Sequence, residues 1–145
     1  MYRFRLETLL HHCGYQEEVC QTELAQAQRE LSDEQGKLNR KKNLKQESLE
    51  KLQSKKKENP TVFDIMLHMN YLTQLSKDIE NQALRVQKIT KLVDQKRHEL
   101  ITIMKKCKTL QILKDRDWQA YQQKLIQNER KLMDEVASTR YVRKM

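Results

Sequence analysis

The sequence predicts an all-α protein in which two long helices form an antiparallel coiled-coil hairpin, the second helix being longer and overhanging the first. Three observations predict this class. The 145 residues include only two Gly and one Pro, so few residues suit tight turns. Charged residues make up 34% of the chain and hydrophobic residues 37%. The hydrophobic residues recur singly at helical spacing, a pattern that fills a seam between helices and not a globular core.

A heptad repeat predicts the first helix at about residues 2–57. One seam position of each heptad, the a position, is filled by Leu10, Glu17, Leu24, Leu31, Leu38, Lys45 and Leu52. The other, the d position, is filled by Leu6, Cys13, Cys20, Ala27, Glu34, Lys41, Ser48 and Lys55. The seam thus becomes polar toward its end, where Leu44 and Leu49 indicate that the apolar stripe drifts sideways.

A turn is expected at about residues 58–61, because Asn59 and Pro60 interrupt the heptads. Proline disfavours helical geometry in the residue before it and cannot donate a hydrogen bond to the preceding turn. Thr61 and Asp64 have the spacing of a capping box, which predicts a new helix immediately after Pro60. That helix opens with the apolar residues Val62, Phe63, Ile65, Met66 and Leu67.

The second helix, at about residues 62–141, has a more apolar repeat than the first. Its a positions are Leu72, Ile79, Val86, Val93, Leu100 and Cys107. Its d positions are Leu75, Gln82, Ile89, Lys96, Ile103 and Leu110. Beyond Leu110 the phase changes, because Trp118 follows Cys107 by eleven residues, which is one heptad plus a four-residue stutter.

The short turn makes the two helices antiparallel within a single hairpin domain spanning residues 1–145. Seam residues then face each other as the pairs Leu10 and Leu110, Cys13 and Cys107, Cys20 and Leu100, Ala27 and Val93, and Leu31 and Ile89. The longer second helix leaves an apolar stripe without a partner in the chain: Trp118, Tyr121, Leu125, Leu132 and Val136. Such a stripe predicts contact with another protein, or self-association through the overhang.

The net charge of +9 is concentrated in one segment. Residues 37–57 carry nine basic side chains against two acidic ones, a net charge of +7 that we call the basic block. Continuous basic helices can bind nucleic acid, but this block lacks base-reading residues at suitable spacing and does not lead into a parallel zipper. We therefore favour a tip that faces solvent or an acidic protein, and expect no nucleic acid partner.

Two absences and the cysteine positions narrow the class of protein and its compartment. No apolar run approaches the roughly 18 residues of a membrane span, and Arg3, Arg5 and Glu7 interrupt any N-terminal signal peptide. We therefore expect a cytoplasmic protein without a transmembrane segment. Its cysteines are odd in number and occupy seam positions, so we interpret them as reduced core residues.

We expect no catalytic residue, no metal site and no cofactor. His11, His12 and Cys13 are adjacent on a helix and therefore point in different directions, and no second ligand cluster follows at finger spacing. A two-helix hairpin has no concave, partly dry pocket in which a pKa could be tuned for chemistry.

Both ends of the chain resemble the flagellar FliJ family, which is related to the YscO stalk proteins of virulence secretion. The N-terminal residues that carry the resemblance are Tyr2, Phe4, Arg5, Leu6, Glu7, Leu9, Leu10, Glu17, Glu18, Leu24, Ala25, Ala27 and Leu31. The C-terminal ones are Lys106, Lys108, Leu110, Leu113, Lys114, Tyr121, Glu129, Lys131, Asp134, Glu135, Ala137 and Arg140. The resemblance rests on the order of these residues along the chain together with the chain length.

The resemblance implies a non-enzymatic stalk of the type III protein export apparatus, peripherally associated with the membrane. In that family the helical ends enter the hexameric export ATPase and promote its assembly and activity, and export chaperones are further partners. The residues this assigns to ATPase contact are Phe4, Leu6, Leu9, Trp118, Tyr121, Leu125, Leu132, Met133, Asp134, Glu135 and Arg140. Ordinary seam packing remains the alternative for each leucine.

The family also has a segment that contacts a subunit of the membrane export gate, and Tyr71, Leu72, Leu75 and Ile79 resemble it. Because the last three also lie on the predicted seam, only Tyr71 is free in this register. Two other classes of function stay open, a generic coiled-coil tether and a basic nucleic-acid-binding helical protein. The sequence leaves open whether the secretion system is flagellar or of the virulence type.

Overall fold

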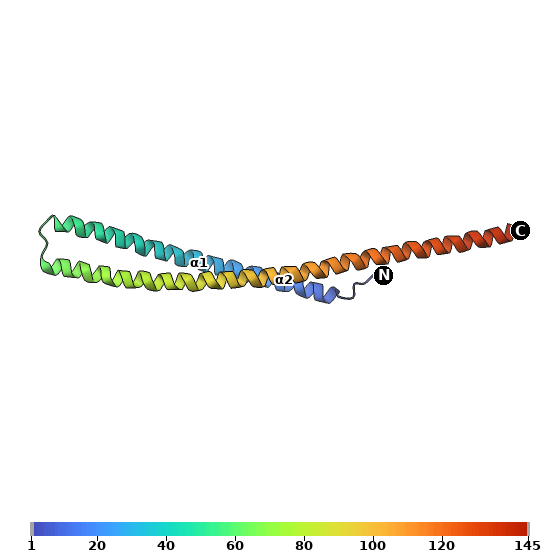
Figure 1. Cartoon of the computed structure of the whole chain (residues 1–145), viewed down its shortest axis with the longest axis horizontal. Helices are drawn as coiled ribbons and strands as arrows, with labels where there is room; N and C mark the ends of the chain where they lie inside the picture. Colours follow the sequence, from blue (N-terminus) through green and yellow to red (C-terminus); the bar gives the residue numbers. More distant parts are fainter. Residues whose placement is uncertain (1, 145) are drawn as a thin grey trace. The chain divides into compact units, whose positions relative to one another are not determined.

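A computed structural model describes residues 2–144 and contains two helices, α1 at Glu7–Lys56 and α2 at Val62–Lys144 (Figure 1). The helices have 50 and 83 residues and pack against each other, and the described residues contain no strand. The predicted fold class, an all-α antiparallel hairpin with a longer second helix, is therefore confirmed.

The turn between the helices depends on a left-handed residue followed by proline. The last turn of α1 tightens, because the amide of Glu58 donates to the carbonyl of Lys55 at 3.0 Å. Asn59 then adopts a φ of 58°, a left-handed conformation that asparagine tolerates better than most residues. Pro60 cannot continue α1, so the chain reverses close to the expected position.

Helix α2 begins with the predicted cap. The hydroxyl oxygen of Thr61 accepts a hydrogen bond from the amide of Asp64 at 3.3 Å. The carbonyl of Thr61 accepts one from the amide of Ile65 at 3.2 Å. The Thr61 hydroxyl therefore satisfies the amide of Asp64, which has no partner within the helix, and α2 starts without a linker.

The contacts divide the chain into two compact units. The turn unit comprises Cys20–Leu100, and the terminal unit comprises Met1–Val19 with Ile101–Met145. Each unit contains one segment of α1 and one of α2, and each is described by itself.

The seam of the turn unit follows the predicted heptads. Its buried residues all occupy a or d positions: Ala27, Ser48, Leu52, Leu72, Leu75, Gln82 and Val93. Leu44 and Leu49 are 45% and 38% exposed, so the expected sideways drift of the stripe is wrong. Lys45, which is half-buried, keeps the seam on its original face, because a lysine stem can cover apolar surface while its ammonium group reaches water.

Two polar seam positions of α2 find partners across the turn unit. Lys96 pairs with Glu23 at 3.0 Å and with Glu99 at 3.6 Å, and the hydrogen bond to Glu23 is the main cause that raises the pKa of Lys96. Gln82, only 2% exposed, donates from Nε2 to the backbone carbonyl of Glu34 at 3.0 Å and also to its carboxylate. A buried side-chain amide without a hydrogen-bond partner would destabilise the fold. Because Gln82 and Glu34 meet in only one register of the two helices, the pair favours that register.

In the terminal unit, α1 begins at Glu7 and not at about residue 2. None of residues 2–6 is a Ser, Thr, Asp or Asn that could act as an N-cap, and Glu7 supplies the negative charge favoured in a first turn. Residues 2–6 are irregular instead, and the amide of Glu7 donates to the carbonyl of Phe4 at 3.2 Å.

The seam of the terminal unit contains a disulfide between Cys13 and Cys107. The predicted facing pair is therefore confirmed, whereas the expectation that every cysteine is reduced is wrong for these two. The physical reason is the register, which sets their Cα atoms 5.6 Å apart, inside the range that a disulfide spans. Cys20 is free and half-buried.

Oxidation should link Cys13 to Cys107 within one chain. We expect the oxidised chain to migrate faster on a non-reducing gel and to gain up to about 4 kcal/mol in free energy of unfolding, because the bond restricts a long loop of the unfolded chain. Cys13→Ser should abolish both effects, and the matched Cys20→Ser variant should keep them. A cross-link that includes Cys20 would contradict the register.

Acid should destabilise the chain partly through Glu34. The hydrogen bond from Gln82 is the main cause that lowers the pKa of Glu34, and Lys37, whose ammonium lies 3.3 Å away, lowers it further. As the pH falls, the Glu34 carboxylate is therefore protonated in the unfolded chain before it is protonated in the folded chain. The contribution of ionised Glu34 to the free energy of unfolding is complete above the ordinary glutamate pKa of about 4.3. It is lost as the pH falls through the lower pKa that Glu34 has in the folded chain.

The test replaces the donor. Gln82→Leu should reduce the loss of stability between about pH 5 and about pH 3, measured by denaturant unfolding with circular dichroism. Gln87→Leu, at an exposed position of α2, is the matched control and should behave like the parent chain. Identical acid sensitivity in both variants would show that the hydrogen bond from Gln82 does not perturb Glu34.

Candidate partner-binding surfaces

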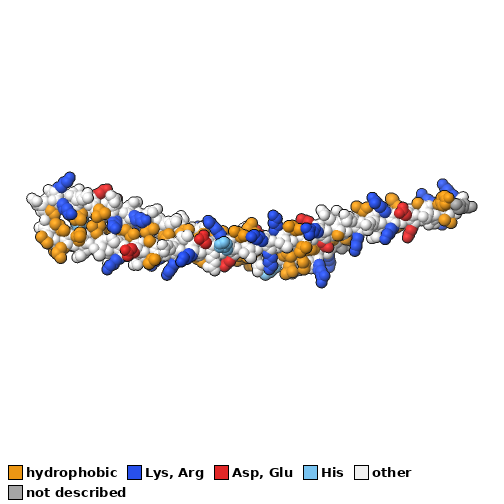
Figure 2. Space-filling view, viewed as in Figure 1, with side chains coloured by type: hydrophobic (Ala, Val, Ile, Leu, Met, Phe, Trp, Pro, Cys, Tyr) orange, Lys and Arg blue, Asp and Glu red, His pale blue; other side chains and the backbone are white. Residues whose placement is uncertain are grey.

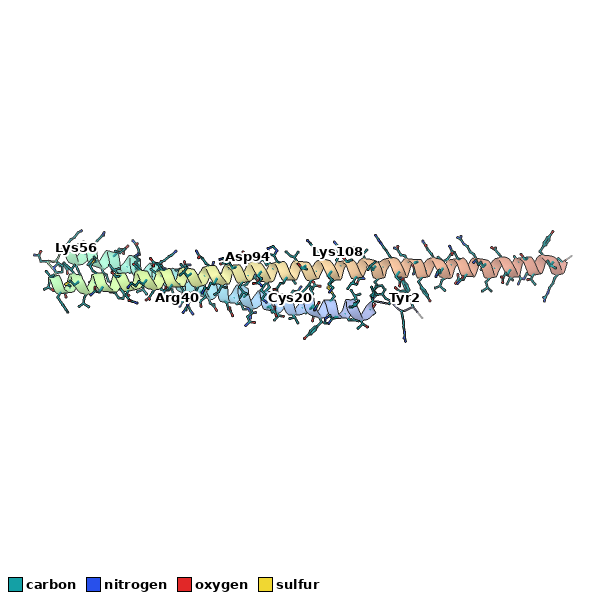
Figure 3. The ribbon with its side chains drawn as sticks, turned by 60° about the horizontal axis from the view of Figure 1, so that its bottom comes forward. Tyr2, Cys20, Arg40, Lys56, Asp94 and Lys108 are labelled. Carbon is teal, nitrogen blue, oxygen red and sulfur yellow. A yellow bond between two sulfur atoms is a disulfide. The ribbon has the colours of Figure 1, made fainter. Side chains whose placement is uncertain are left out.

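The N-terminal segment packs on α2 through an aromatic cluster of Tyr2, Trp118 and Tyr121. The Tyr2 ring centroid lies 4.8 Å from that of Trp118, edge to face, and 5.2 Å from that of Tyr121. Trp118 and Tyr121 stack at 5.9 Å. Such arrangements are favourable for aromatic rings. Figure 3 shows Tyr2 beside α2, so the expectation that Trp118 and Tyr121 have no partner within the chain is wrong.

Polar contacts hold the same segment in place. The Tyr2 hydroxyl donates to a carboxylate oxygen of Asp117 at 3.0 Å, and the ammonium of Lys114 pairs with Glu7 at 3.0 Å. Burial against α2 raises the pKa of Tyr2, and the hydrogen bond to Asp117 raises it further because it holds the protonated hydroxyl. Beyond these contacts, neither α1 nor the residues that precede it cover α2.

Beyond Tyr121, every described residue of α2 is exposed, and we call this part the tail. In Figure 3 the tail continues past Tyr2 as a single helix. Its exposed large apolar residues are Leu125, Ile126, Leu132, Met133, Val136, Tyr141 and Val142. Leu125, Leu132 and Val136 thus remain the unpartnered stripe that the sequence predicted.

Part of the tail presents a shallow, mostly apolar hollow that two basic side chains also line. Its lining residues are Leu132, Met133, Val136, Ala137, Arg140, Tyr141 and Lys144. They recur at three- and four-residue steps and therefore share one helix face. Asp134 and Glu135 are exposed but do not line this hollow. The hollow brings together three of the predicted ATPase contacts, Leu132, Met133 and Arg140.

The predicted contacts near the N-terminus are only partly accessible. Phe4 and Leu6 are half-buried in the terminal unit, whereas Leu9 is 49% exposed. Trp118 remains 43% exposed despite its contact with Tyr2. Leu9 and Trp118 are therefore the residues of this region that a partner can reach most readily.

Of the four predicted gate-contact residues, the structure leaves one at the surface. Tyr71 is 45% exposed and shares a hollow with Lys55, Asp64, Leu67 and His68. Leu72 and Leu75 are buried in the seam at 8% and 7% exposure, and Ile79 is half-buried. These three side chains pack against α1, so only Tyr71 is freely available.

Sequence reasoning missed a surface at the start of α2, which we call the tip patch. It consists of the exposed apolar residues Val62, Phe63, Met66, Leu67 and Met69. The signal that could have identified it is the density of apolar residues in this stretch, which is too high for one seam face. In Figure 2 apolar side chains gather at this end of the turn unit, close to lysine and arginine side chains.

Within residues 2–144 the geometry consists of a packed seam with exposed apolar surfaces at the tip and the tail. Residues 2–145 match the family described as flagellar FliJ protein. The chain belongs to the flagellar FliJ family. Comparisons with curated proteins and with solved structures each gave no significant match.

Membership of the FliJ family makes this chain a component of the flagellar protein export apparatus. It also decides between the two secretion systems that the sequence left open, because the matching family is the flagellar one. Within residues 2–144 of this FliJ-family chain, neither helix is apolar over a long enough stretch to span a membrane.

Tyr2 should shield the only tryptophan of this FliJ-family chain. Tyr2→Ala removes the ring that packs on Trp118, so we expect the tryptophan fluorescence maximum to move to longer wavelength. Tyr141→Ala, at a 65% exposed position of the tail, is the matched control and should leave the spectrum unchanged. Identical spectra for Tyr2→Ala and the parent chain would mean that Tyr2 does not pack there in solution.

Proposed function

We propose that this chain is the non-enzymatic stalk of the flagellar export apparatus, which inserts its chain ends into the hexameric export ATPase. The observation that carries the proposal is the tail, where α2 continues as a single helix with an exposed apolar stripe. A monomer gains nothing from exposing such a stripe, whereas burial in a partner removes it from water.

The tail hollow supports this proposal through its chemistry. Leu132 and Met133 are 63% and 74% exposed, so a partner could bury most of their apolar surface. Arg140 and Lys144 line the same hollow and could pair with acidic side chains at its edge. An apolar centre with a charged edge is the usual organisation of a protein interface.

The second part of the proposal is a link from the ATPase to the membrane export gate. Tyr71 is the residue we assign to gate contact, because it is the exposed member of the segment that resembles the family's gate-contact residues. We propose that Leu72, Leu75 and Ile79 support it indirectly by fixing α2 on α1. The stalk itself performs no chemistry in this scheme, and it acts from the cytoplasmic side of the membrane. Escort of export chaperones remains an expectation of family resemblance.

The decisive experiment measures both partners with two variants. The double variant Leu132→Ser/Met133→Ser should weaken binding to the purified export ATPase on the order of tenfold, and it should abolish the rise in hexamer formation and ATP turnover that the parent chain causes. Tyr71→Ala should instead weaken binding to the gate subunit and reduce motility, because it removes an exposed ring without disturbing the seam.

Leu84→Ser is the neutral control, because Leu84 is 56% exposed and belongs to neither surface. Circular dichroism should show unchanged helix content in all three variants. An ATPase whose assembly and turnover ignore the parent chain would refute the stalk proposal. Unchanged gate binding and motility in Tyr71→Ala would remove only the gate assignment.

A further inference from the structure

The tip patch carries the most exposed apolar side chains of the turn unit. Val62 is 75% exposed and Phe63 is 71% exposed, and both lie in the first turn of α2. Met66, Leu67 and Met69 follow at 59%, 54% and 54%. Surface residues of this size in one cluster indicate an interaction site, because isolated exposed apolar residues are common but contiguous patches are not.

Helical periodicity explains why the seam cannot cover this patch. Ile65 and Leu72 share the face that packs toward α1, and both are partly or fully buried. At 3.6 residues per turn, Phe63, Met66 and Leu67 lie on the other side of α2. The side chains of Phe63 and Met66 therefore project away from α1, whereas Leu67 borders a hollow that Lys55 also lines.

The basic block supplies the second observation. Lys55, Lys56 and Lys57 directly precede the turn and are all exposed, and Lys55 lines the same hollow as Leu67. Figure 3 shows Lys56 at this end of α1. Glu58 and Asp64 are the opposing charges nearby, so residues 51–64 carry four lysines against two acidic side chains, a net charge of +2. The tip thus combines exposed apolar side chains with a surplus of cations.

We propose that the tip docks directly on an anionic lipid surface. Val62, Phe63 and Met66 would enter the boundary between headgroups and acyl chains, while the lysines at the end of α1 bind lipid phosphates. Apolar residues flanked by basic ones are the combination that holds peripheral segments at anionic membranes. Lysine stems are long enough to keep their ammonium groups at headgroup level while Phe63 inserts.

A lipid surface fits better than an acidic protein, because of shape. A protein partner would need a cavity complementary to the exposed side chains of Val62, Phe63 and Met66. Fluid lipid needs no preformed cavity, and unbranched methionines adapt readily to it. This proposal does not depend on the stalk function, since lipid contact requires neither the ATPase nor the gate subunit.

The test is sedimentation of the full chain with vesicles. We expect binding to vesicles of phosphatidylglycerol and phosphatidylethanolamine, weaker binding at high salt, and little binding to phosphatidylcholine alone. Phe63→Ser/Met66→Ser should weaken binding on the order of tenfold. Lys55→Gln/Lys56→Gln should have a similar effect, because each basic residue near an anionic surface contributes to attraction, again on the order of tenfold in total.

Two matched controls separate this surface from general stickiness and charge. Leu84→Ser removes an apolar side chain that is 56% exposed elsewhere on α2, and Lys88→Gln/Lys91→Gln removes two exposed cations. Both should bind anionic vesicles like the parent chain, with unchanged circular dichroism.

Several results would overturn the proposal. One is equal binding to neutral and anionic vesicles, or none to either. Another is loss of binding in Leu132→Ser/Met133→Ser but not in Phe63→Ser/Met66→Ser, which would assign lipid contact to the tail. A chain that ignores vesicles but binds an acidic protein through Phe63 would identify the tip as a protein-docking surface. The ATPase and gate experiments stand or fall separately, because these vesicles contain neither partner.

Discussion

The register of the seam is the constraint on which the other features depend. Long helices with this many charged residues gain little from burial unless their apolar positions meet across a common line, since most helix stability in proteins comes from packing. Gln82 fixes that line in the turn unit, because its buried amide is satisfied only opposite Glu34. Cys13 and Cys107 fix it in the terminal unit. Once the register is set, it decides which apolar residues of the paired segments are buried in the seam.

The sequence predicted the seam because both helices carry heptads that bury the same positions in the structure. It predicted the turn because Pro60 is the only proline and follows an asparagine that tolerates a left-handed conformation. Periodicity could not predict the start of α1, since Tyr2 is held by Asp117, which lies 115 residues away. It also misjudged Leu44 and Leu49, because a heptad pattern does not reveal how well a lysine stem can substitute for leucine at the seam.

The candidate surfaces were less predictable than the seam. The tail was foreseen because a longer second helix must outlast the first, but the contact between Tyr2 and Trp118 required the folded chain. The tip patch was predicted only as the start of a helix, because the heptads counted from Leu72 were not extended back to it. The seam takes Ile65 and leaves Phe63 and Met66 exposed. A binding surface is complementary to its partner, and a single sequence carries no information about the structure of that partner.

Stability and binding are carried by different residues in this fold. Seam residues such as Leu75 and Val93 hold the helices together and are inaccessible, whereas Phe63, Tyr71 and Met133 are exposed and contribute little to packing. Substitutions at the exposed positions can therefore change partner affinity while the hairpin stays folded. A partner that needed Leu72 or Leu75 would first have to open the seam, and the cost of separating the helices would oppose its binding. Partners of this hairpin are thus expected to select the faces that the register leaves uncovered.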